Sequence, residues 1–313
     1  YPSSTMEYDG SQTGIEPDTT KDLQSSIGAP MSLSIGDLTV ACVSGGHLRL
    51  DGGSMFGVVP KALWQRRSAP DDQNRILLAT NCLLVRSPTQ TVLVDTGYGG
   101  KASDRDRQHF ALECENVLVN NLAAIGVEPE HIDLVILTHL HFDHAGGCTA
   151  NDSSGQPVPV FPRARYVIQQ HEWDDATADL PELTGNYFKR DFLPLQEAGQ
   201  LELIDGEAEL IPGLTCRLTG GHTRGHQIIH LSSGGHQAIY PADLCPSTAH
   251  LRTFWTMAYD QYPLALRRIK PRVLGDAADQ QWLVIFDHDP QVQAAYLTRD
   301  PKQEFAVRER VAI

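Results

Sequence analysis

The chain has 313 residues, of which 41% are hydrophobic, and it carries a formal net charge of −14. That length can bury the core of one large domain or two small ones. No apolar run reaches the roughly 18 residues of a membrane span, so we expect no membrane partner. The sequence also contains no dense Lys/Arg run, which argues against nucleic acid as a partner. An acidic surface instead favours a neutral or weakly charged small-molecule substrate.

The cysteines and the first residues bear on the compartment. The six cysteines form no CxxC pair, and we interpret them as buried thiols of a reducing compartment, with a disulfide framework as the alternative. They are Cys42, Cys82, Cys114, Cys148, Cys216 and Cys245. The opening segment YPSSTMEYDG lacks the basic and apolar regions of a signal peptide, which favours a cytoplasmic protein. Because the first residue is Tyr, a processed or exported origin stays open.

Residues 1–32 are rich in Ser, Thr, Asp, Gly and Pro, a composition typical of disordered segments. We therefore expect a polar N-terminal arm over 1–32 and a single domain over 33–313. If the arm is ordered, then the body of the chain, a neighbouring subunit or a crystal contact holds it. The second of these would make the protein a homodimer.

Hydrophobic patterning in the body predicts strands and helices in alternation. Strands are expected at 37–43, 81–87, 91–97 and 134–140, and a second set at 164–170, 213–219, 227–232, 236–243 and 281–288. Helices are expected around 108–125, 187–199 and 262–281. Two groups of strands with interposed helices predict two sheets packed face to face, with helices outside.

The densest group of candidate metal ligands is the segment THLHFDH at 138–144, which follows an apolar strand. In an extended stretch, His139 and His141 point to the same side. A turn can then bring Asp143 and His144 to a second position. Imidazole and carboxylate are both zinc ligands. Two ligand groups from one short loop therefore predict two metal ions.

Three further candidates are expected at strand ends. His222 lies in the glycine-rich segment GGHTRGH, Asp243 ends the predicted strand HQAIYPAD, and His288 ends QWLVIFDH. A single histidine of this kind is usually structural. Several candidate ligands at successive strand ends are better explained by one site at the edge of a sandwich.

These motifs closely resemble those of the metallo-β-lactamase superfamily, and within it the YtnP-like group of quorum-quenching lactonases. The likeness covers roughly 35–290 and includes segments outside the ligand motifs. They are DGGSMFGVVP (51–60) with LW (63–64), NY (186–187), ADLCP (242–246) with His250, and AYD (258–260) with YP (262–263). The resemblance implies an αββα sandwich of two mixed β-sheets with outer helices.

The resemblance also implies a site of two divalent metal ions, with zinc favoured and manganese, iron or cobalt as substitutes. The first metal would be held by His139, His141 and His222, and the second by Asp143, His144 and His288. Asp243 would bridge both, and a hydroxide between the metals would be the nucleophile. Asp143 would donate a proton to the leaving alkoxide, so Asp143 and Asp243 are the expected catalytic residues.

Other residues are expected around this site. Asp95, in LVDTG, fits a carboxylate that holds a metal-binding histidine, or else a turn cap before Gly97. Met55, Phe56 and Tyr259 are candidates for an apolar acyl pocket, as are Trp64 and Trp173, with plain core packing as the alternative. His250 faces the pocket or the surface. Cys245 is expected on the same side of a strand as Asp243, which is the better bridge.

We therefore predict an enzyme that opens lactones or cleaves carboxylic esters, with N-acyl-homoserine lactone as the lead substrate. The alternative is a phosphotriester or aryl-phosphate hydrolase that uses the same dinuclear site. Asp at the bridging position disfavours a β-lactamase, and the acidic charge disfavours a nuclease. A non-catalytic metal-binding module is a weaker alternative, because the full ligand set is present.

Overall fold

The computed structural model describes residues 31–113, 115–183, 185 and 187–313. Most of the arm predicted over 1–32, together with Cys114 and Asn186, lies outside the described residues. The strands are β1 (Leu33–Ile35), β2 (Leu38–Asp51), β3 (Arg75–Arg86), β4 (Thr91–Val94), β5 (Leu134–Ile136), β6 (Thr149–Asn151), β7 (Pro157–Pro159), β8 (Arg165–Gln169), β9 (Leu201–Ile204), β10 (Ala208–Ile211), β11 (Leu214–Leu218), β12 (Gln227–Ser233), β13 (His236–Tyr240), β14 (Leu283–Ile285), β15 (Ala294–Asp300) and β16 (Glu304–Val311).

The described helices are short, except the last. They are α1 (Gly52–Phe56), α2 (Lys61–Trp64), α3 (Asp104–Phe110), α4 (Val117–Ala124), α5 (Phe142–Ala145), α6 (Gln170–Thr177), α7 (Leu193–Glu197) and α8 (Pro263–Gln280). Single 3₁₀ turns connect them: η2 (Pro129–His131), η3 (Gly146–Cys148), η4 (Pro181–Leu183), η5 (Lys189–Asp191), η6 (Ala242–Leu244) and η7 (Thr248–His250).

Two seven-stranded sheets form the body, in the orders β1-β2-β3-β4-β5-β8-β9 and β10-β11-β12-β13-β14-β15-β16. Both are mixed. The first is antiparallel from β1 to β4 and parallel from β4 to β9. In the second, the β13–β14 pair is parallel between antiparallel neighbours. The predicted pair of mixed sheets is therefore confirmed.

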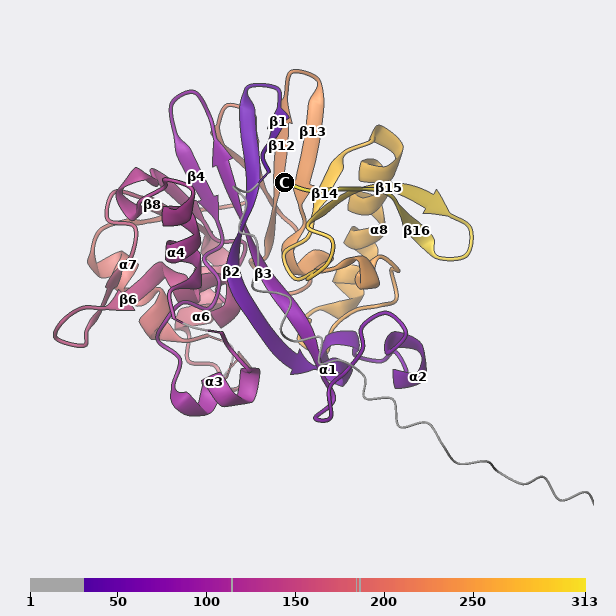
Figure 1. The fold of residues 1–313 in the computed structure, drawn as a ribbon, viewed down its shortest axis with the longest axis horizontal. Coiled ribbons are helices and arrows are strands. Elements are labelled where there is room, and N and C mark those ends of the chain that lie inside the picture. Colours follow the sequence, from indigo (N-terminus) through magenta and orange to yellow (C-terminus); the bar gives the residue numbers. More distant parts are fainter. Residues whose placement is uncertain (1–30, 114, 184, 186) are drawn as a thin grey trace, which may run out of the picture.

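The hydrophobic core lies in three layers. A central cluster joins inward-facing residues of both sheets, such as Val85 and Ile136 from one and Ile229 from the other. On the outer face of the first sheet, α4, α6 and α7 bury apolar side chains, and on the outer face of the second sheet α8 does the same through Leu274. Figure 1 shows α4, α6 and α7 on one side of the molecule and α8 on the other. The predicted αββα arrangement is confirmed.

One predicted helix is wrong in its extent. The pattern over 108–125 predicted a single helix, but the chain forms α3 and α4 with a break between them. At the break, Ala111 and Asn116 adopt φ angles of 47° and 57°. Left-handed backbone of this kind ends a helix, and hydrophobic periodicity does not reveal it. Phe110 is consequently the last residue of α3.

Several strands end earlier than predicted, always on the side of the candidate ligands. The stretch 134–140 keeps only β5, and 281–288 keeps only β14. Strand β13 ends at Tyr240, so Asp243 lies in η6 instead of ending a strand. After β5 a side chain takes over a backbone group, because Asp95 Oδ1 accepts the N–H of Thr138 at 2.8 Å, and after β13 the left-handed φ of 46° at Ala242 turns the chain out of the sheet.

The grouping of strands and some elements also differ from expectation. The sequence pattern groups the segment 164–170 with the second set of predicted strands, but β8 pairs in parallel with β5 of the first sheet. Strands β15 and β16 extend the second sheet beyond the last predicted strand. The helix predicted over 187–199 is reduced to η5 and α7.

The cysteines and the helices bear on the expectations about thiols and membranes. The five cysteines described by the structure (Cys42, Cys82, Cys148, Cys216 and Cys245) are free and buried. Within the described part of the chain, every helix is too short or too polar to cross a lipid bilayer.

Candidate metal centre

The first candidate ligands lie on the loop that leaves β5. Thr138 is fixed at its start, because its hydroxyl donates to Asp95 Oδ2 at 2.8 Å. His139 and His141 follow in this loop, and His141 is the residue before α5, which carries Asp143 and His144. All four side chains are buried. The loop and the first turn of α5 thus present imidazoles and a carboxylate from one point of the chain.

The other candidates come from the second sheet. His222 lies between β11 and β12, Asp243 in η6 after β13, and His288 after β14. The turn before His222 depends on Gly221, which has φ 91° and lies where a Cβ would stand 2.9 Å from the Cβ of Leu266 in α8. Ligand-bearing loops of both sheets therefore meet at one edge of the sandwich.

Glu172 in α6 ties two of these loops together. It is fully buried; its Oε1 accepts the N–H of Leu140 at 2.9 Å, and its Oε2 accepts the hydroxyl of Thr223 at 2.6 Å. Burial raises the pKa of this carboxyl. Gly225 permits the approach, because a Cβ there would stand 2.2 Å from the backbone nitrogen of Glu172. Sequence reasoning missed Glu172, which carries no motif signal.

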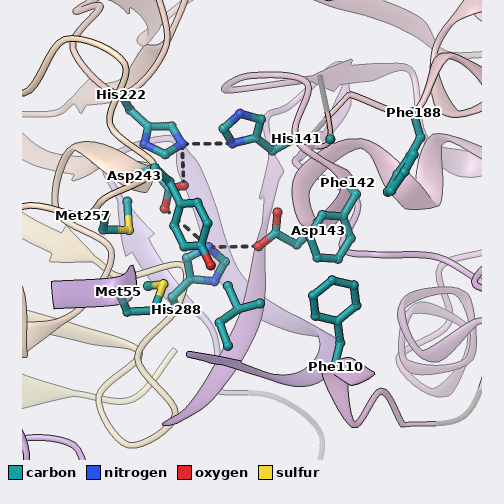
Figure 2. A pocket seen from close by; sticks show the side chains of 13 residues that line it. Met55, Phe110, His141, Phe142, Asp143, Phe188, His222, Asp243, Met257 and His288 are labelled. Atoms are coloured by element: carbon teal, nitrogen blue, oxygen red, sulfur yellow. Dashed lines mark hydrogen bonds and ion pairs between the residues drawn. The ribbon is translucent and has the colours of Figure 1, made fainter. Parts of the chain in front are cut away.

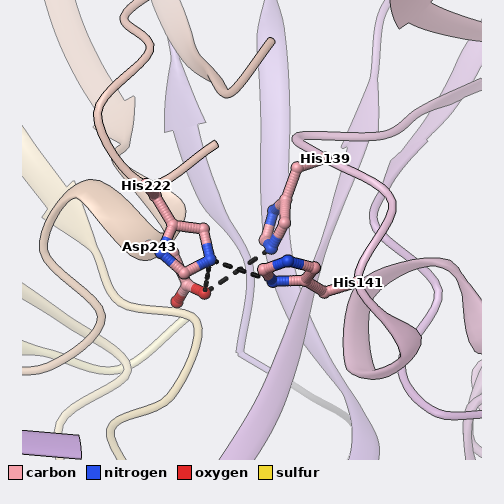
Figure 3. Close-up of side chains that lie close together, drawn as sticks. All are labelled: His139, His141, His222 and Asp243. Atoms are coloured by element: carbon pink, nitrogen blue, oxygen red, sulfur yellow. Dashed lines mark hydrogen bonds and ion pairs between the residues drawn. The ribbon is translucent and has the colours of Figure 1, made fainter. Parts of the chain in front are cut away.

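A first cluster consists of His139, His141, His222 and Asp243, whose ligand atoms lie within 4.8 Å of one another. Asp243 Oδ2 lies 2.9 Å from His222 Nε2 and 3.6 Å from His139 Nε2, and His141 Nδ1 lies 3.0 Å from His222 Nε2. Figure 3 shows the three rings and the carboxylate converging on one point.

A second cluster adjoins it through the same carboxylate. It contains His144, Asp243, Asp287 and His288. His144 Nε2 lies 3.2 Å from His288 Nε2, and these two nitrogens lie 3.7 Å and 3.4 Å from the oxygens of Asp243. Asp143 stands at the margin of this cluster, with Oδ2 3.6 Å from His288 Nε2. The structure therefore brings all seven predicted ligands together and adds Asp287, which was not predicted.

Hydrogen bonds fix the tautomers of three imidazoles. His144 Nδ1 lies 2.9 Å from Asp95 Oδ2, His222 Nδ1 lies 2.8 Å from Asp260 Oδ1, and His288 Nδ1 lies 2.7 Å from the carbonyl oxygen of Ala79. These acceptors hold the Nδ1 proton, so in the neutral ring the Nε2 lone pair faces the clusters. Asp95 thus lies where the sequence placed it, beside a candidate ligand, whereas Asp260 was not predicted.

The pKa values of the clustered histidines are shifted in opposite directions. Burial lowers the pKa of His139 and His141 well below the usual range, so both rings are neutral. Burial alone would lower the pKa of His222 and His144 too, but Asp243 and Asp260 raise that of His222 to about 10, and Asp95 and Asp143 raise that of His144 to about 9. A metal ion must displace such protons, so metal affinity falls as the pH falls.

These residues fit a pair of zinc-like ions. Nitrogen and oxygen ligands of a tetrahedral zinc lie about 3.4 Å from each other; six separations within the clusters are 2.9–3.7 Å, and all the ligand atoms of each cluster lie within 4.8 Å of one another. In addition, the buried Nε2 of His139 has no hydrogen-bond partner among the described residues. A cation between converging lone pairs accounts for both observations.

The clusters form the floor of a cavity of about 150 Å³. Its walls are mostly apolar, and Figure 2 shows Met55, Phe110, Phe142, Phe188 and Met257 around the polar floor. The complete lining is Leu50, Met55, Phe110, His141, Phe142, Asp143, Gly185, Phe188, His222, Asp243, Met257, Tyr259 and His288.

The predicted pocket residues divide into two groups. Met55 and Tyr259 line the cavity, whereas Phe56 and His250 lie behind it. His250 is only 1% exposed, which excludes a surface role; its ring stacks on Phe56 at 4.7 Å, and its Nε2 lies 2.8 Å from the Met55 carbonyl. His250 therefore holds the backbone of a wall residue.

Three further candidate residues lie in apolar clusters and do not line the cavity. Trp64 and Trp173 pack in apolar clusters and are absent from the lining. Cys245 follows η6 instead of lying on a strand beside Asp243, and it is buried among apolar residues packed around α8. Phe188, Leu50 and Met257 were missed, because no pattern separates an aromatic or aliphatic pocket residue from core.

Comparison with known proteins agrees with this geometry. The model of the metallo-beta-lactamase superfamily matches residues 75–282. An N-acyl homoserine lactonase of Bacillus cereus is 30% identical over 228 residues, which cover 69% of this chain and 83% of that protein. The chain belongs to the metallo-beta-lactamase superfamily and is a metal-dependent hydrolase.

Solved structures extend the likeness over most of the chain. A probable metal-dependent hydrolase from Staphylococcus aureus has a TM-score of 0.79 and 33% identity, covering 90% of this chain and all of that one. AidC, a dizinc quorum-quenching lactonase in complex with a product, has a TM-score of 0.74 and 21% identity, covering 91% of this chain and 98% of that one. At that identity, the AidC likeness shows the shared fold alone.

Proposed function

We propose that this chain opens N-acyl-homoserine lactones, or cleaves related carboxylic esters, at a centre of two metal ions. One observation carries the proposal: two histidine clusters share the carboxylate of Asp243 at the floor of an apolar pocket. The relationship to a lactonase at 30% identity supports the substrate class. Zinc is the favoured metal because imidazole supplies most of the ligand atoms.

His139, His141 and His222 would hold the first ion, Asp143, His144 and His288 would hold the second, and Asp243 would hold both. Two dications so bound supply a water molecule of lowered pKa and polarise a carbonyl oxygen. Asp95, Asp260 and Glu172 would orient the ligand side chains and their loops through hydrogen bonds. The substrate would reach the metal ions from the side of the pocket.

Asp143 is suited to move a proton, because it lies at the junction of floor and pocket. Its side chain lines the cavity, and its Oδ2 stands 3.6 Å from His288 Nε2. A carboxylate there can take the proton of the attacking water and deliver it to the alkoxide that leaves when the lactone ring opens.

The walls suit an acyl chain. The apolar side chains of the lining exclude water and provide hydrophobic contact along the opening to the floor. Among the described residues no Lys or Arg lines the cavity, so its walls offer no fixed positive side chain to an anionic substrate. The acidic net charge of −14 acts in the same direction, in favour of a neutral amphiphile.

The proposal is tested by assaying hexanoyl- and decanoyl-homoserine lactone beside paraoxon with one purified, metal-loaded sample. We expect kcat/KM for both lactones to exceed that for paraoxon, because the apolar walls bind an acyl chain. The Asp243→Ala variant is the background control for each substrate. Faster hydrolysis of paraoxon than of either lactone would replace the lactonase assignment with the phosphotriesterase alternative.

A further inference from the structure

Asp287 is a buried carboxylate with no hydrogen-bond partner. It is 1% exposed, and neither Oδ1 nor Oδ2 has a partner among the described residues. A buried carboxylate without N–H donors is costly unless it faces a cation. None of the roles derived above for the seven candidate ligands accounts for it.

The carboxylate lies inside the second cluster. Its ligand oxygen and those of His144, Asp243 and His288 lie within 4.8 Å of one another, and its Oδ2 is 3.5 Å from His288 Nε2. The other nitrogen of His288 is committed to the Ala79 carbonyl, so Nε2 is the ring atom that faces Asp287, as the partner of an ion pair when it carries a proton and as a lone pair when it does not. Once a metal ion displaces that proton, both groups present electron pairs to the same space.

Asp287 and Asp143 approach the second cluster from different sides. Asp143 lines the substrate pocket, whereas Asp287 is absent from the lining and is almost fully buried. The backbone of Asp287 is fixed, because its carbonyl oxygen accepts the N–H of Asn81 in β3 at 2.7 Å. A ligand that reaches the second metal ion from the protein interior leaves the face of that ion toward the pocket open for substrate.

We propose that Asp287 is an additional ligand of the second metal ion; this inference rests on the dinuclear site proposed above. The second position would then have the carboxylates of Asp143, Asp243 and Asp287 beside two imidazoles. The first would have three imidazoles and one carboxylate. Since carboxylates suit Mn²⁺ and imidazoles suit Zn²⁺, the second position should accept Mn²⁺ more readily than the first.

The test compares wild-type protein with Asp287→Asn, which keeps the shape and removes the charge. Both are stripped of metal with a chelator and titrated with buffered Zn²⁺, and bound metal is measured by elemental analysis. We expect the affinity for the second ion to fall about 10- to 100-fold and that for the first to change little. The metal-free variant should melt close to metal-free wild type, because no hydrogen bond is lost and the cost of burying the charge of Asp287 disappears together with its ion pair to His288.

Asp191→Asn is the matched control, since Asp191 is also a buried carboxylate but pairs with Lys101 at 3.1 Å, outside both clusters. It should lower the melting temperature and leave the affinity for both ions unchanged. If wild type binds two ions and Asp287→Asn binds the second equally well, the inference is wrong and the dinuclear proposal stands. If wild type binds only one ion, both the inference about Asp287 and the dinuclear proposal are wrong. A lower melting temperature of metal-free Asp287→Asn with unchanged zinc affinity would assign Asp287 a structural role instead.

Discussion

Replacing Asp243 by Ala is expected to reduce kcat/KM for lactones by about a thousandfold or more, or roughly 4 kcal/mol of transition-state stabilisation. Among the described residues Asp243 is the only one that belongs to both clusters, and its oxygens lie 2.9 Å from His222 Nε2 and 3.4 Å from His288 Nε2. In the proposed site, its removal would take a ligand from both ions and the negative charge that holds them together. Metal content should fall along with activity.

The fold should survive this change, because the hydrophobic core between the two sheets does not include Asp243. Circular dichroism of Asp243→Ala checks that point. Asp279→Ala, which removes an exposed carboxylate paired with Arg299, is the control and should retain wild-type activity. Near-normal turnover by Asp243→Ala would show that the active site lies elsewhere.

Lactone opening is expected to exceed cleavage of a penicillin-type amide by at least about a hundredfold in kcat/KM, or roughly 2.7 kcal/mol of barrier. The amide is the harder bond to break. In addition, a penicillin carries a carboxylate, and the described cavity offers it no Lys or Arg. The proposed metal centre would need no serine nucleophile, which agrees with the absence of a GxSxG elbow from the sequence.

The measurement is kcat/KM for both substrates at neutral pH, with the same metal loading. Because the same preparation serves both assays, incomplete loading lowers both values and leaves their ratio unchanged. Equal or better turnover of the β-lactam would overturn the proposed substrate class while leaving the metal site in place.

The sequence predicted the fold and the region of the site for a clear physical reason. The THLHFDH segment follows an apolar strand, and His222, Asp243 and His288 follow later strands, so one sheet edge can collect them all. The seven side chains indeed meet there. The metal-binding role of each side chain stays a prediction.

The remaining parts of the site depend on contacts through space that leave no local pattern. Asp260 reaches His222 from 38 residues away, and Glu172 reaches Thr223 from 51 residues away. Asp287 adjoins His288 in sequence, yet only its burial without a partner distinguishes it from an ordinary loop carboxylate. The early strand ends were missed because left-handed residues such as Asp95, with φ 57°, have no hydrophobic signature.

The metal content of the purified chain tests the central claim most directly. The protein should be loaded with excess Zn²⁺, freed of unbound metal by gel filtration, and analysed for metal and protein in the same fractions. The two clusters that share Asp243 predict close to two ions per chain. A fully loaded sample that never exceeds one ion per chain would contradict the dinuclear account.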